Sequence, residues 1–292
     1  MPRRIRPPVD EDTHAVLDVI LARDVADLGT PDFTLDDLKG DWSAPGVVLE
    51  HDARVAVNGG RIRGYAILLG DDAMIAVHPE AEGRGNGTVL RRWAEARAAE
   101  RGTAVLRQMV FGTNDGARSH LREAGYEPCQ HYFRLRGDLA DVPVPPDVSL
   151  RTFEPQDEPA VYRLVQDAFS EVDGYVEQTP EEWHAKGIGR ANHDPSLWLL
   201  LEDDEGLVGA ALGDRWGNGT GYVAELAVAT RARGRGHGRG LLLALLDAFR
   251  RAGLRHAELS VHGRNPALAL YESAGLRRVW EAERWEKALG RA

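Results

Sequence analysis

The second half of the chain carries apolar patterns that predict helices and strands in a clear order. A helix is expected over 158–169, where Val161, Leu164, Val165 and Phe169 recur at helical spacing. The acidic turn at 203–206 separates two apolar segments and indicates an antiparallel hairpin. The expected elements are a strand over 150–153, the helix over 158–169, strands over 196–202, 207–212 and 222–228, a helix over 241–249, a strand over 257–261 and a helix starting at Asn265.

This order places antiparallel strands first and a strand–loop–helix–strand unit afterwards. It predicts an α/β fold with a mixed, mostly antiparallel sheet flanked by helices, an α+β arrangement rather than a wholly parallel sheet. The segment Thr179-Pro180-Glu181-Glu182 has the spacing of a capping box with proline at the first helical position. A further helix is therefore expected to start there.

The pattern occurs twice in the chain. Ile5-Arg6 recurs as Leu150-Arg151, and glycines 83, 85 and 87 recur as glycines 234, 236 and 238. Between the halves, three prolines at 143, 145 and 146 block both helix and central strand. The sequence therefore predicts two tandem domains, residues 1–137 and 148–292, joined by a linker over 138–147.

Composition narrows the class of protein. Because Cys129 is the one cysteine of the sequence, an internal disulfide is excluded. No metal site is expected, and this cysteine content is consistent with a reducing cytoplasm. The basic N-terminus is not followed by an apolar stretch, so neither secretion nor membrane insertion is expected. The net charge of −10 works against nucleic acid as a partner. Because the protein is acidic as a whole, an anionic ligand is expected to bind at a local cluster of basic residues.

A glycine-rich loop between a strand end and a helix start is the main chemical signal. Alternating glycines let backbone N–H groups converge on an anion, and the helix N-terminus adds partial positive charge. Four arginines, at 231, 233, 235 and 239, concentrate positive charge there, so a phosphate-bearing ligand is expected. The loop consists of Arg233, Gly234, Arg235, Gly236, His237, Gly238, Arg239 and Gly240.

Other interpretations of this loop fit its glycine spacing less well. A Walker loop needs Gly-Lys-Ser/Thr at the helix start, and a dinucleotide fingerprint needs Gly-x-Gly-x-x-Gly, whereas the spacing here is Gly-x-Gly-x-Gly. Arginine-glycine tracts that bind nucleic acid are usually long and disordered. A flexible surface turn with solvated arginines is the remaining alternative.

The loop resembles that of the GNAT superfamily of acyl-CoA-dependent N-acyltransferases, Arg/Gln-x-x-Gly-x-Gly/Ala, at Arg233, Gly236 and Gly238. A second family element is similar to the segment from Asn265 through Tyr271 to Gly275-Leu276. The tandem arrangement resembles the two-domain group that includes mycothiol synthase.

The resemblance implies an opening between the strands that end near Val228 and Val261, with acetyl-CoA as acyl donor. Pantetheine would lie against the backbone of Leu226, Ala227 and Val228, the pyrophosphate would lie on the loop from Gly234 to Gly240, and Asn265 would line the same channel. Tyr271 occupies the family's thiolate-side position.

The general base is a separate question. Glu225 is a carboxylate in an otherwise apolar strand near the expected acyl group and is the candidate base, with a structural or edge role as the alternative. Asp173, His184 and His193 lie in the region that shapes acceptor pockets in relatives. Each is more often a solvated loop residue.

The first half keeps the glycine spacing at 83, 85 and 87 but changes other positions. Glu82 stands where Arg or Gln is expected, Glu80 adds a second negative charge, and Leu121 replaces the tyrosine. We expect a structural, non-catalytic domain that helps form the acceptor cleft and holds coenzyme A weakly at most.

The sequence thus predicts a cytoplasmic N-acetyltransferase, a monomer or homodimer, that acts on a primary amine of a small molecule or peptide by direct transfer. A non-catalytic acyl-CoA-binding or regulatory module and a protein lysine acetyltransferase are the alternatives. The identity of the acceptor amine is open at this stage.

Overall fold

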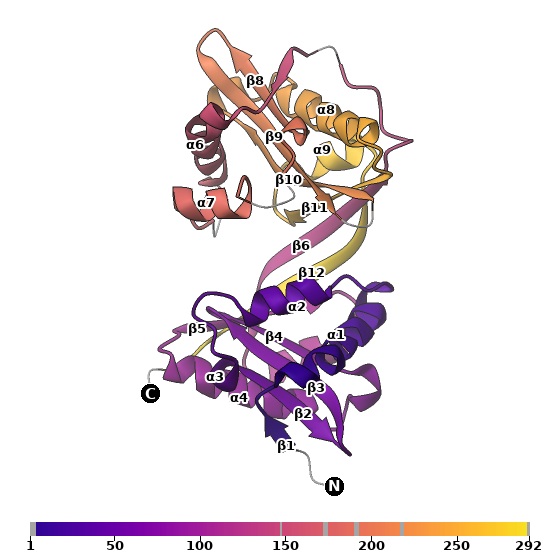
Figure 1. Cartoon of the computed structure of the whole chain (residues 1–292), viewed down its shortest axis with the longest axis vertical. Helices are drawn as coiled ribbons and strands as arrows, with labels where there is room; N and C mark the ends of the chain where they lie inside the picture. Colours follow the sequence, from indigo (N-terminus) through magenta and orange to yellow (C-terminus); the bar gives the residue numbers. More distant parts are fainter. Residues whose placement is uncertain (1–3, 147, 172–174, 190–192, 217–218, 291–292) are drawn as a thin grey trace. The chain divides into compact units, whose positions relative to one another are not determined.

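The computed structural model describes residues 4–146, 148–171, 175–189, 193–216 and 219–290 (Figure 1). The chain divides into two compact units. Unit 1 comprises Met1–Tyr132 and Trp280–Ala292, and unit 2 comprises Phe133–Val279. Each unit has its own core and holds its own run of neighbouring strands.

Unit 1 contains a mixed sheet in the order β1-β2-β3-β4-β5-β12. Helix α1 packs on one face through Val16 and Ile20, and α4 packs on the other face through Leu90 and Ala94. Its elements are β1 (Arg4–Arg6), α1 (Thr13–Leu28), α2 (Leu35–Trp42), α3 (Leu49–Asp52), β2 (Ala53–Asn58), β3 (Arg61–Leu69), β4 (Asp72–Val77), α4 (Asn86–Glu100), β5 (Val105–Phe111), α5 (Asp115–Glu123), the start of β6 (Glu127–Asp138) and most of β12 (Arg277–Ala288).

Unit 2 repeats this plan with the strand order β6-β11-β10-β9-β8-β7. Leu242 and Phe249 of α8 pack on one face, and Val161 of α6 and Trp183 of α7 pack on the other. Its elements are β7 (Leu150–Thr152), α6 (Glu158–Phe169), α7 (Pro180–Lys186), β8 (Trp198–Asp203), β9 (Gly206–Trp216), β10 (Thr220–Val228), α8 (His237–Arg251), β11 (His256–His262) and α9 (Leu268–Ser273), with the end of β6 and the start of β12.

The predicted mixed sheet flanked by helices is confirmed, and the helix over 158–169 matches α6. The capping box at Thr179 is present, since its side chain accepts from the N–H of Glu182 and its own N–H donates to that carboxylate. The last helix begins at Leu268 rather than Asn265. Asn265 Oδ1 instead accepts from the N–H of Ala267 at 2.8 Å and caps the preceding turn.

The compact units differ from the contiguous halves expected from the sequence. The segment 133–138 of β6 belongs to unit 2, and the segment 280–288 of β12 belongs to unit 1. Leu139, in the expected linker, is buried in the core of unit 2, and its N–H donates to the carbonyl of Arg255 at 2.9 Å. The prolines of the expected linker do not reveal that the ends of β6 and β12 belong to different units, because strand pairing depends on residues distant in sequence.

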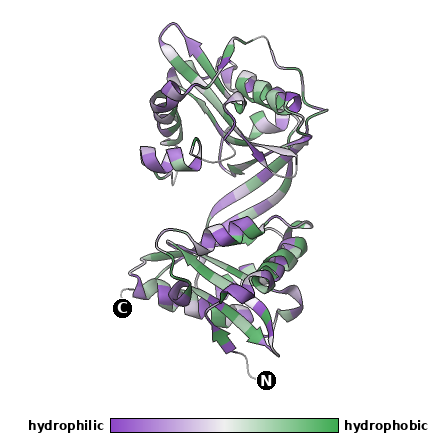
Figure 2. Ribbon diagram, viewed as in Figure 1, coloured by the Kyte–Doolittle hydropathy of each residue, from purple (hydrophilic) through white to green (hydrophobic). Residues whose placement is uncertain are grey.

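Strands β6 and β12 also carry many hydrophilic residues, whereas the central strands are largely hydrophobic (Figure 2).

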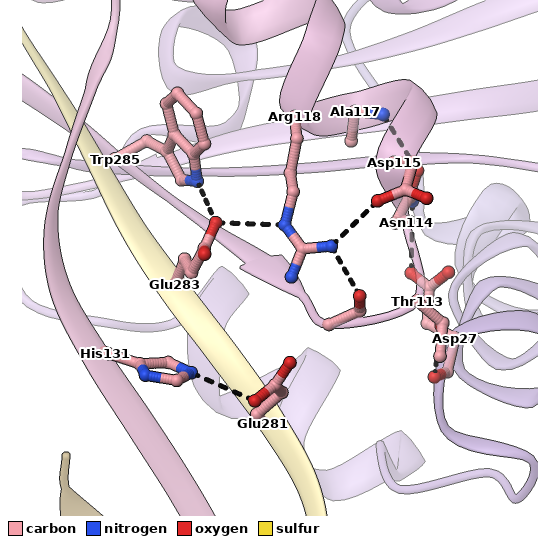
Figure 3. Close-up of polar contacts among 11 residues, drawn as sticks. Asp27, Thr113, Asn114, Asp115, Ala117, Arg118, His131, Glu281, Glu283 and Trp285 are labelled. Carbon is pink, nitrogen blue, oxygen red and sulfur yellow. Dashed lines mark hydrogen bonds and ion pairs between the residues drawn. The ribbon is translucent and has the colours of Figure 1, made fainter.

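Helix α5 fixes the end of β12 within unit 1 (Figure 3). Arg118 donates to Glu283 at 2.9 Å, to Asp115 at 3.0 Å and to the carbonyl of Gly112 at 2.5 Å. Trp285, only 1% exposed, donates its indole N–H to the same Glu283 at 3.1 Å. The end of β12 is therefore an integral part of unit 1.

Close packing in unit 2 gives a stability prediction. A Cβ at Gly221 of β10 would lie 2.4 Å from Cγ of the buried Phe249. We expect Gly221→Ala to lower the free energy of unfolding by about 1–3 kcal/mol, because overpacking displaces the ring. Urea unfolding measures this. Gly40→Ala in α2, where a Cβ meets nothing within 4 Å, is the control and should be neutral or slightly stabilising. Equal effects of the two changes would contradict the packing argument.

Candidate functional site

Strands β10 and β11 separate in the middle of unit 2. Their parallel register covers only Thr220–Tyr222 against His256–Glu258, although β10 continues to Val228 and β11 to His262. Beyond Tyr222 the facing edges therefore diverge and leave an opening between strands. This is where the sequence placed the expected channel, along Leu226, Ala227 and Val228.

A β-bulge lies where the two strands separate. Against β9, the register of β10 shifts between Val223 and Glu225, so that Ala224 is the extra residue, and it is exposed. Bulges re-aim side chains and are frequent next to active sites. Here the bulge places Glu225 on the face of the sheet that carries α7.

Glu225 lines a pocket of about 80 Å³ at this point. The half-buried carboxylate accepts a hydrogen bond from the indole N–H of Trp183 at 3.4 Å. The pocket walls come from α7 and the loops flanking it, from β8 and β9, and from the bulge. They are Gln178, Trp183, Lys186, Gly187, Trp198, Leu212, Asp214, Ala224 and Glu225.

The surroundings of Glu225 raise its pKa to about 7. Burial is the main cause, because it penalises the charged carboxylate. The indole N–H of Trp183 opposes this rise, the negative charge of Asp214 adds to it, and the positive charge of Lys186 opposes it. A carboxyl group with this pKa is protonated and ionised in comparable amounts near neutral pH, which suits a general base.

The glycine loop has the geometry of an anion site. Gly234 and Gly236 have φ values of +76° and +84°, which glycine adopts without a steric penalty. Gly236 is the N-cap of α8, so the helix begins at His237, four residues before the expected Leu241. Unpaired N–H groups of a first helical turn attract anions.

Two of the loop arginines already bind carboxylates. Arg231 pairs with Asp203 at 2.5 Å, and Arg233 pairs with Glu171 at 2.5 Å. Arg233 also donates to the carbonyl of Val228 at 3.0 Å, which ties the loop to the end of β10. The local positive charge is therefore smaller than the four arginines of the sequence suggest. Exposed ion pairs are weak, however, so an anionic ligand can displace the carboxylates.

Tyr271 of α9 is 8% exposed and belongs to the core cluster on the α8 face of the sheet, together with Val223 and Val261. Burial raises its pKa to about 12, so the hydroxyl stays protonated. Glu225 faces α7 instead. The two candidate catalytic residues thus approach β10 from opposite faces of the sheet.

The remaining candidates have varied surroundings. Arg239 donates to the Ser273 hydroxyl at 2.7 Å, whereas Gly240 is buried against Val148. The exposed His184 contacts Glu158 at 2.7 Å. His193 packs edge-on against Trp198, with ring centroids 4.7 Å apart, and burial lowers its pKa. Asp173 lies outside the described residues.

Sequence reasoning missed most of the pocket. Trp183 and Trp198 lie in segments expected only as a helix and a strand, and Gln178 and Asp214 carried no motif. The one available signal was an acidic residue, Asp214, two positions after the apolar segment 207–212. The pocket depends on the packing of α7 over the sheet, which periodicity does not specify.

Unit 1 keeps the opening but differs in chemistry. Its β4 pairs with β5 only at Asp72 and Ala73, and a pocket of about 500 Å³ lies between the diverging strands. The register of β4 against β3 is continuous, without a bulge. Met74 stands three residues before the end of β4, as Glu225 does in β10, and the buried Leu121 stands on α5.

The two acidic residues of the unit 1 loop are both paired. Glu82 bonds to Arg23, and Glu80 contacts Arg63 at 3.3 Å. Arg23 and Glu82 both line the pocket of unit 1.

Two further features concern the described residues as a whole. They include no group of three or more His, Cys, Asp and Glu side chains arranged to hold a metal ion. None of their helices combines the length and the apolar character that crossing a membrane requires.

Comparisons with known proteins point to one family. The model of the Acetyltransferase (GNAT) family matches residues 159–276. The mycothiol acetyltransferase of Acidothermus cellulolyticus is 32% identical, with 74% of this chain and 73% of that protein covered. That of Amycolatopsis mediterranei is 34% identical, with 77% and 80% covered.

Solved structures extend the similarity over both units. A GCN5-related N-acetyltransferase from Sphaerobacter thermophilus has a TM-score of 0.84 at 28% identity and covers 98% of this chain and 96% of its own. A tandem GNAT protein from the clavulanic acid biosynthesis pathway has a TM-score of 0.75 at 20% identity, with 100% of both chains covered. The latter shows the shared fold alone.

The raised pKa of Glu225 gives a prediction for stability. Its folded pKa of about 7 exceeds the usual unfolded value of about 4.3, so its contribution to stability is present at low pH and is lost as pH rises to 7. At pH 8, Glu225→Gln should raise the free energy of unfolding by about 1–3 kcal/mol, because the amide is never charged. Urea unfolding between pH 4 and 8 measures this, with the exposed Asp204→Asn as control. A constant difference at every pH would contradict the assignment.

Proposed function

Since this chain belongs to the GNAT family of acetyltransferases, we propose that it transfers the acetyl group of acetyl-CoA directly to a primary amine of a small molecule or peptide, with the active site in unit 2. The supporting observation is the pocket around Glu225, located at the bulge where β10 leaves β11. It holds a carboxylate of raised pKa on the α7 face of the sheet, while the protonated Tyr271 packs on the opposite face.

The donor would bind along the opening of unit 2. Pantetheine would hydrogen-bond the backbone of Leu226–Val228, and the pyrophosphate would occupy the loop over 234–240 at the N-terminus of α8. In this proposal the phosphates take the place of Glu171 on Arg233, a substitution that the exposure of that ion pair allows. Asn265 would line the same channel.

Glu225 would act as the general base. Its carboxylate accepts a proton from the ammonium form of the amine, directly or through water, and the neutral nitrogen attacks the thioester carbonyl carbon. Backbone N–H groups at the strand separation would stabilise the oxyanion. The C–N bond forms and the nitrogen loses a second proton to water, while the C–S bond breaks and the thiolate of coenzyme A leaves. Glu225 returns its proton to solvent after turnover.

Tyr271 would stabilise the departing thiolate. Its pKa of about 12 lies well above the usual value of about 8.5 for a thiol, so full proton donation is unfavourable. The hydroxyl therefore acts as a hydrogen-bond donor to the developing negative charge. The thiolate can then take its proton from solvent.

We infer that unit 1 is non-catalytic. It has Met74 in place of the candidate base, Leu121 in place of the tyrosine, and a β4 without a bulge. Its pocket is large enough for a ligand, but Glu82 at the loop disfavours a pyrophosphate. Coenzyme A is therefore expected to bind there weakly or not at all.

The names of the relatives and the volume of the pocket bear on the choice of acceptor. The relatives are named mycothiol acetyltransferases, which makes the acceptor of mycothiol acetylation the first amine to assay. The small volume of the pocket favours a slender amine. A screen of primary amines with acetyl-CoA, followed by detection of the free thiol of coenzyme A, tests the function. An enzyme that releases no thiol with any amine would support a binding module instead.

The loop arginines should determine acetyl-CoA affinity. Changing Arg233 and Arg235 together to Gln removes two positive charges at the proposed pyrophosphate site and should weaken binding more than tenfold, with the difference shrinking at high salt. Calorimetric titration of the full chain measures this. Changing Arg163 and Arg251 to Gln, two exposed arginines away from the loop, is the charge-matched control. Unchanged affinity in the loop variant would remove the loop from the site.

Tyr271→Phe should lower turnover at nearly constant acetyl-CoA affinity. The ring keeps its packing, and only the hydroxyl that stabilises the transition state is lost. We expect kcat to fall by at least about tenfold. Full general acid catalysis typically contributes about 100- to 10,000-fold, whereas this hydroxyl only donates a hydrogen bond. Steady-state kinetics with an amine found in the screen measures kcat, and calorimetry measures binding. Unchanged kcat would eliminate the leaving-group role.

A further inference from the structure

The pocket of unit 1 leads to a buried arginine. It has a volume of about 500 Å³ and lies between the diverging strands β4 and β5. Arg91 of α4, which is 8% exposed, and the buried Gln108 of β5 line its deep end. Glu82 and Met109, which also line it, are exposed. The pocket thus runs from an open mouth to a buried positive charge.

Two of the three guanidinium nitrogens of Arg91 have protein partners. Nη1 donates to Glu95 at 2.5 Å, and Nε donates to Nε2 of His120 at 3.2 Å. The third, Nη2, has no hydrogen-bond partner among the residues that the structure describes, and it is not one of the atoms enclosed away from solvent. It is therefore the nitrogen that a ligand can reach.

The deep end of the pocket carries positive charge. Glu95 also accepts from Nζ of Lys287 at 3.2 Å, so one carboxylate is shared between two cations. His120 adds no negative charge. Burial and the charge of Arg91 lower the pKa of His120, so the ring is neutral near pH 7. One positive charge thus remains uncompensated beside the pocket.

Unit 2 shows that the shared fold does not require polar groups here. The shift that aligns the two glycine loops places Leu242 of α8 at the position of Arg91, and Leu242 is fully buried in the core. His120 precedes Leu121 as Leu270 precedes Tyr271, so a second leucine of unit 2 is replaced by a polar residue. Burial of a charged side chain is costly unless it is paired, which indicates a function for this one.

We propose that the pocket of unit 1 is a binding site for a small monocarboxylate with an apolar body. The carboxylate accepts hydrogen bonds from Nη2 of Arg91, and the body lies against the apolar residues Val77, Val110 and Leu121 of the pocket. Hydrogen bonds between two ionised groups are among the strong ones in proteins. The site belongs to unit 1 alone and does not depend on acetyl transfer in unit 2.

The charges at the mouth favour one carboxylate over a pyrophosphate. Arg23 pairs there with Asp27 at 2.6 Å and also with Glu82, so two carboxylates match one cation. A pyrophosphate on the glycine loop would meet this excess of negative charge. A monocarboxylate instead places its single charge against Arg91 at the deep end and leaves only uncharged groups near the mouth.

Octanoate and octanamide are the probes, because they share one chain and differ in charge. Calorimetric titration of the full chain should show tighter binding of octanoate. Arg91→Leu should reduce the octanoate-to-octanamide affinity ratio about ten- to a hundredfold, the range for a hydrogen bond to a charged group. Lys287 still pairs with Glu95 in this variant. Arg92→Leu, at the exposed neighbouring position of α4, is the control and should leave the ratio unchanged.

Two results of this titration would overturn the proposal. One is an unchanged ratio in Arg91→Leu, and the other is a wild-type protein that does not bind octanoate.

Gly87→Leu tests the same pocket without altering its charge, and it serves if Arg91→Leu fails to fold. Gly87 lines the pocket, and a Cβ there would meet only Cγ2 of Val77, at 3.8 Å, so the fold has room for a side chain. We expect octanoate affinity to fall more than tenfold, because the leucine occupies the space of the ligand body. Equal affinity would place octanoate elsewhere and refute the site.

Coenzyme A separates this site from a second donor site. At a coenzyme A concentration that saturates unit 2, octanoate should bind with unchanged affinity. Displacement of octanoate by coenzyme A, together with weaker coenzyme A binding in Arg91→Leu, would make unit 1 a coenzyme A site and overturn the inference. A protein that acetylates no amine but binds octanoate through Arg91 would lose the proposed function and keep this inference.

Discussion

The separation of β10 from β11 is the constraint on which the rest of unit 2 depends. Parallel strands that diverge after Tyr222 leave backbone N–H and carbonyl groups along Leu226–Val228 without a strand partner on that edge. Backbone groups in such a place require hydrogen-bonding partners from water or from a ligand. An extended, amide-containing donor such as pantetheine supplies them. The glycine loop and α8 follow directly from the end of the same strand, so one opening positions both ends of the proposed donor.

The bulge at Ala224 connects this opening to the proposed chemistry. Without it, the strict alternation of a strand would place residue 225 on the same face as Val223, which contacts the α8 side of the sheet. With it, Glu225 lies under α7 and among aromatic residues, where burial raises its pKa to about 7. The same burial makes the ionised carboxylate a cost to stability. Unit 2 thus carries an unfavourable group where the proposed reaction needs a base.

The comparison of the two units separates fold from chemistry. Both have diverging parallel strands followed by a glycine turn and a helix, so the opening is a property of the shared architecture. Unit 1 has the larger pocket, at about 500 Å³ against about 80 Å³ around Glu225, yet it has Met74 and Leu121 where the proposal places the base and the tyrosine. The proposal therefore assigns the active site by the chemical character of a few side chains and not by pocket volume.

The sequence by itself determined the repeat, the mixed sheet and the candidate donor loop. These features depend on local signals, namely apolar periodicity, glycines that permit positive φ, and the order of strands and helices along the chain. It also identified Glu225 and Tyr271 as candidates, from a carboxylate in an apolar strand and from a family motif. Only the tertiary structure assigned the end of β6 to unit 2 and most of β12 to unit 1, paired the loop arginines with Asp203 and Glu171, and placed Trp198, Gln178 and Asp214 around one pocket. Those outcomes depend on strand register, on a one-residue bulge and on the packing of α7, which join residues distant in sequence and leave no periodic trace in it.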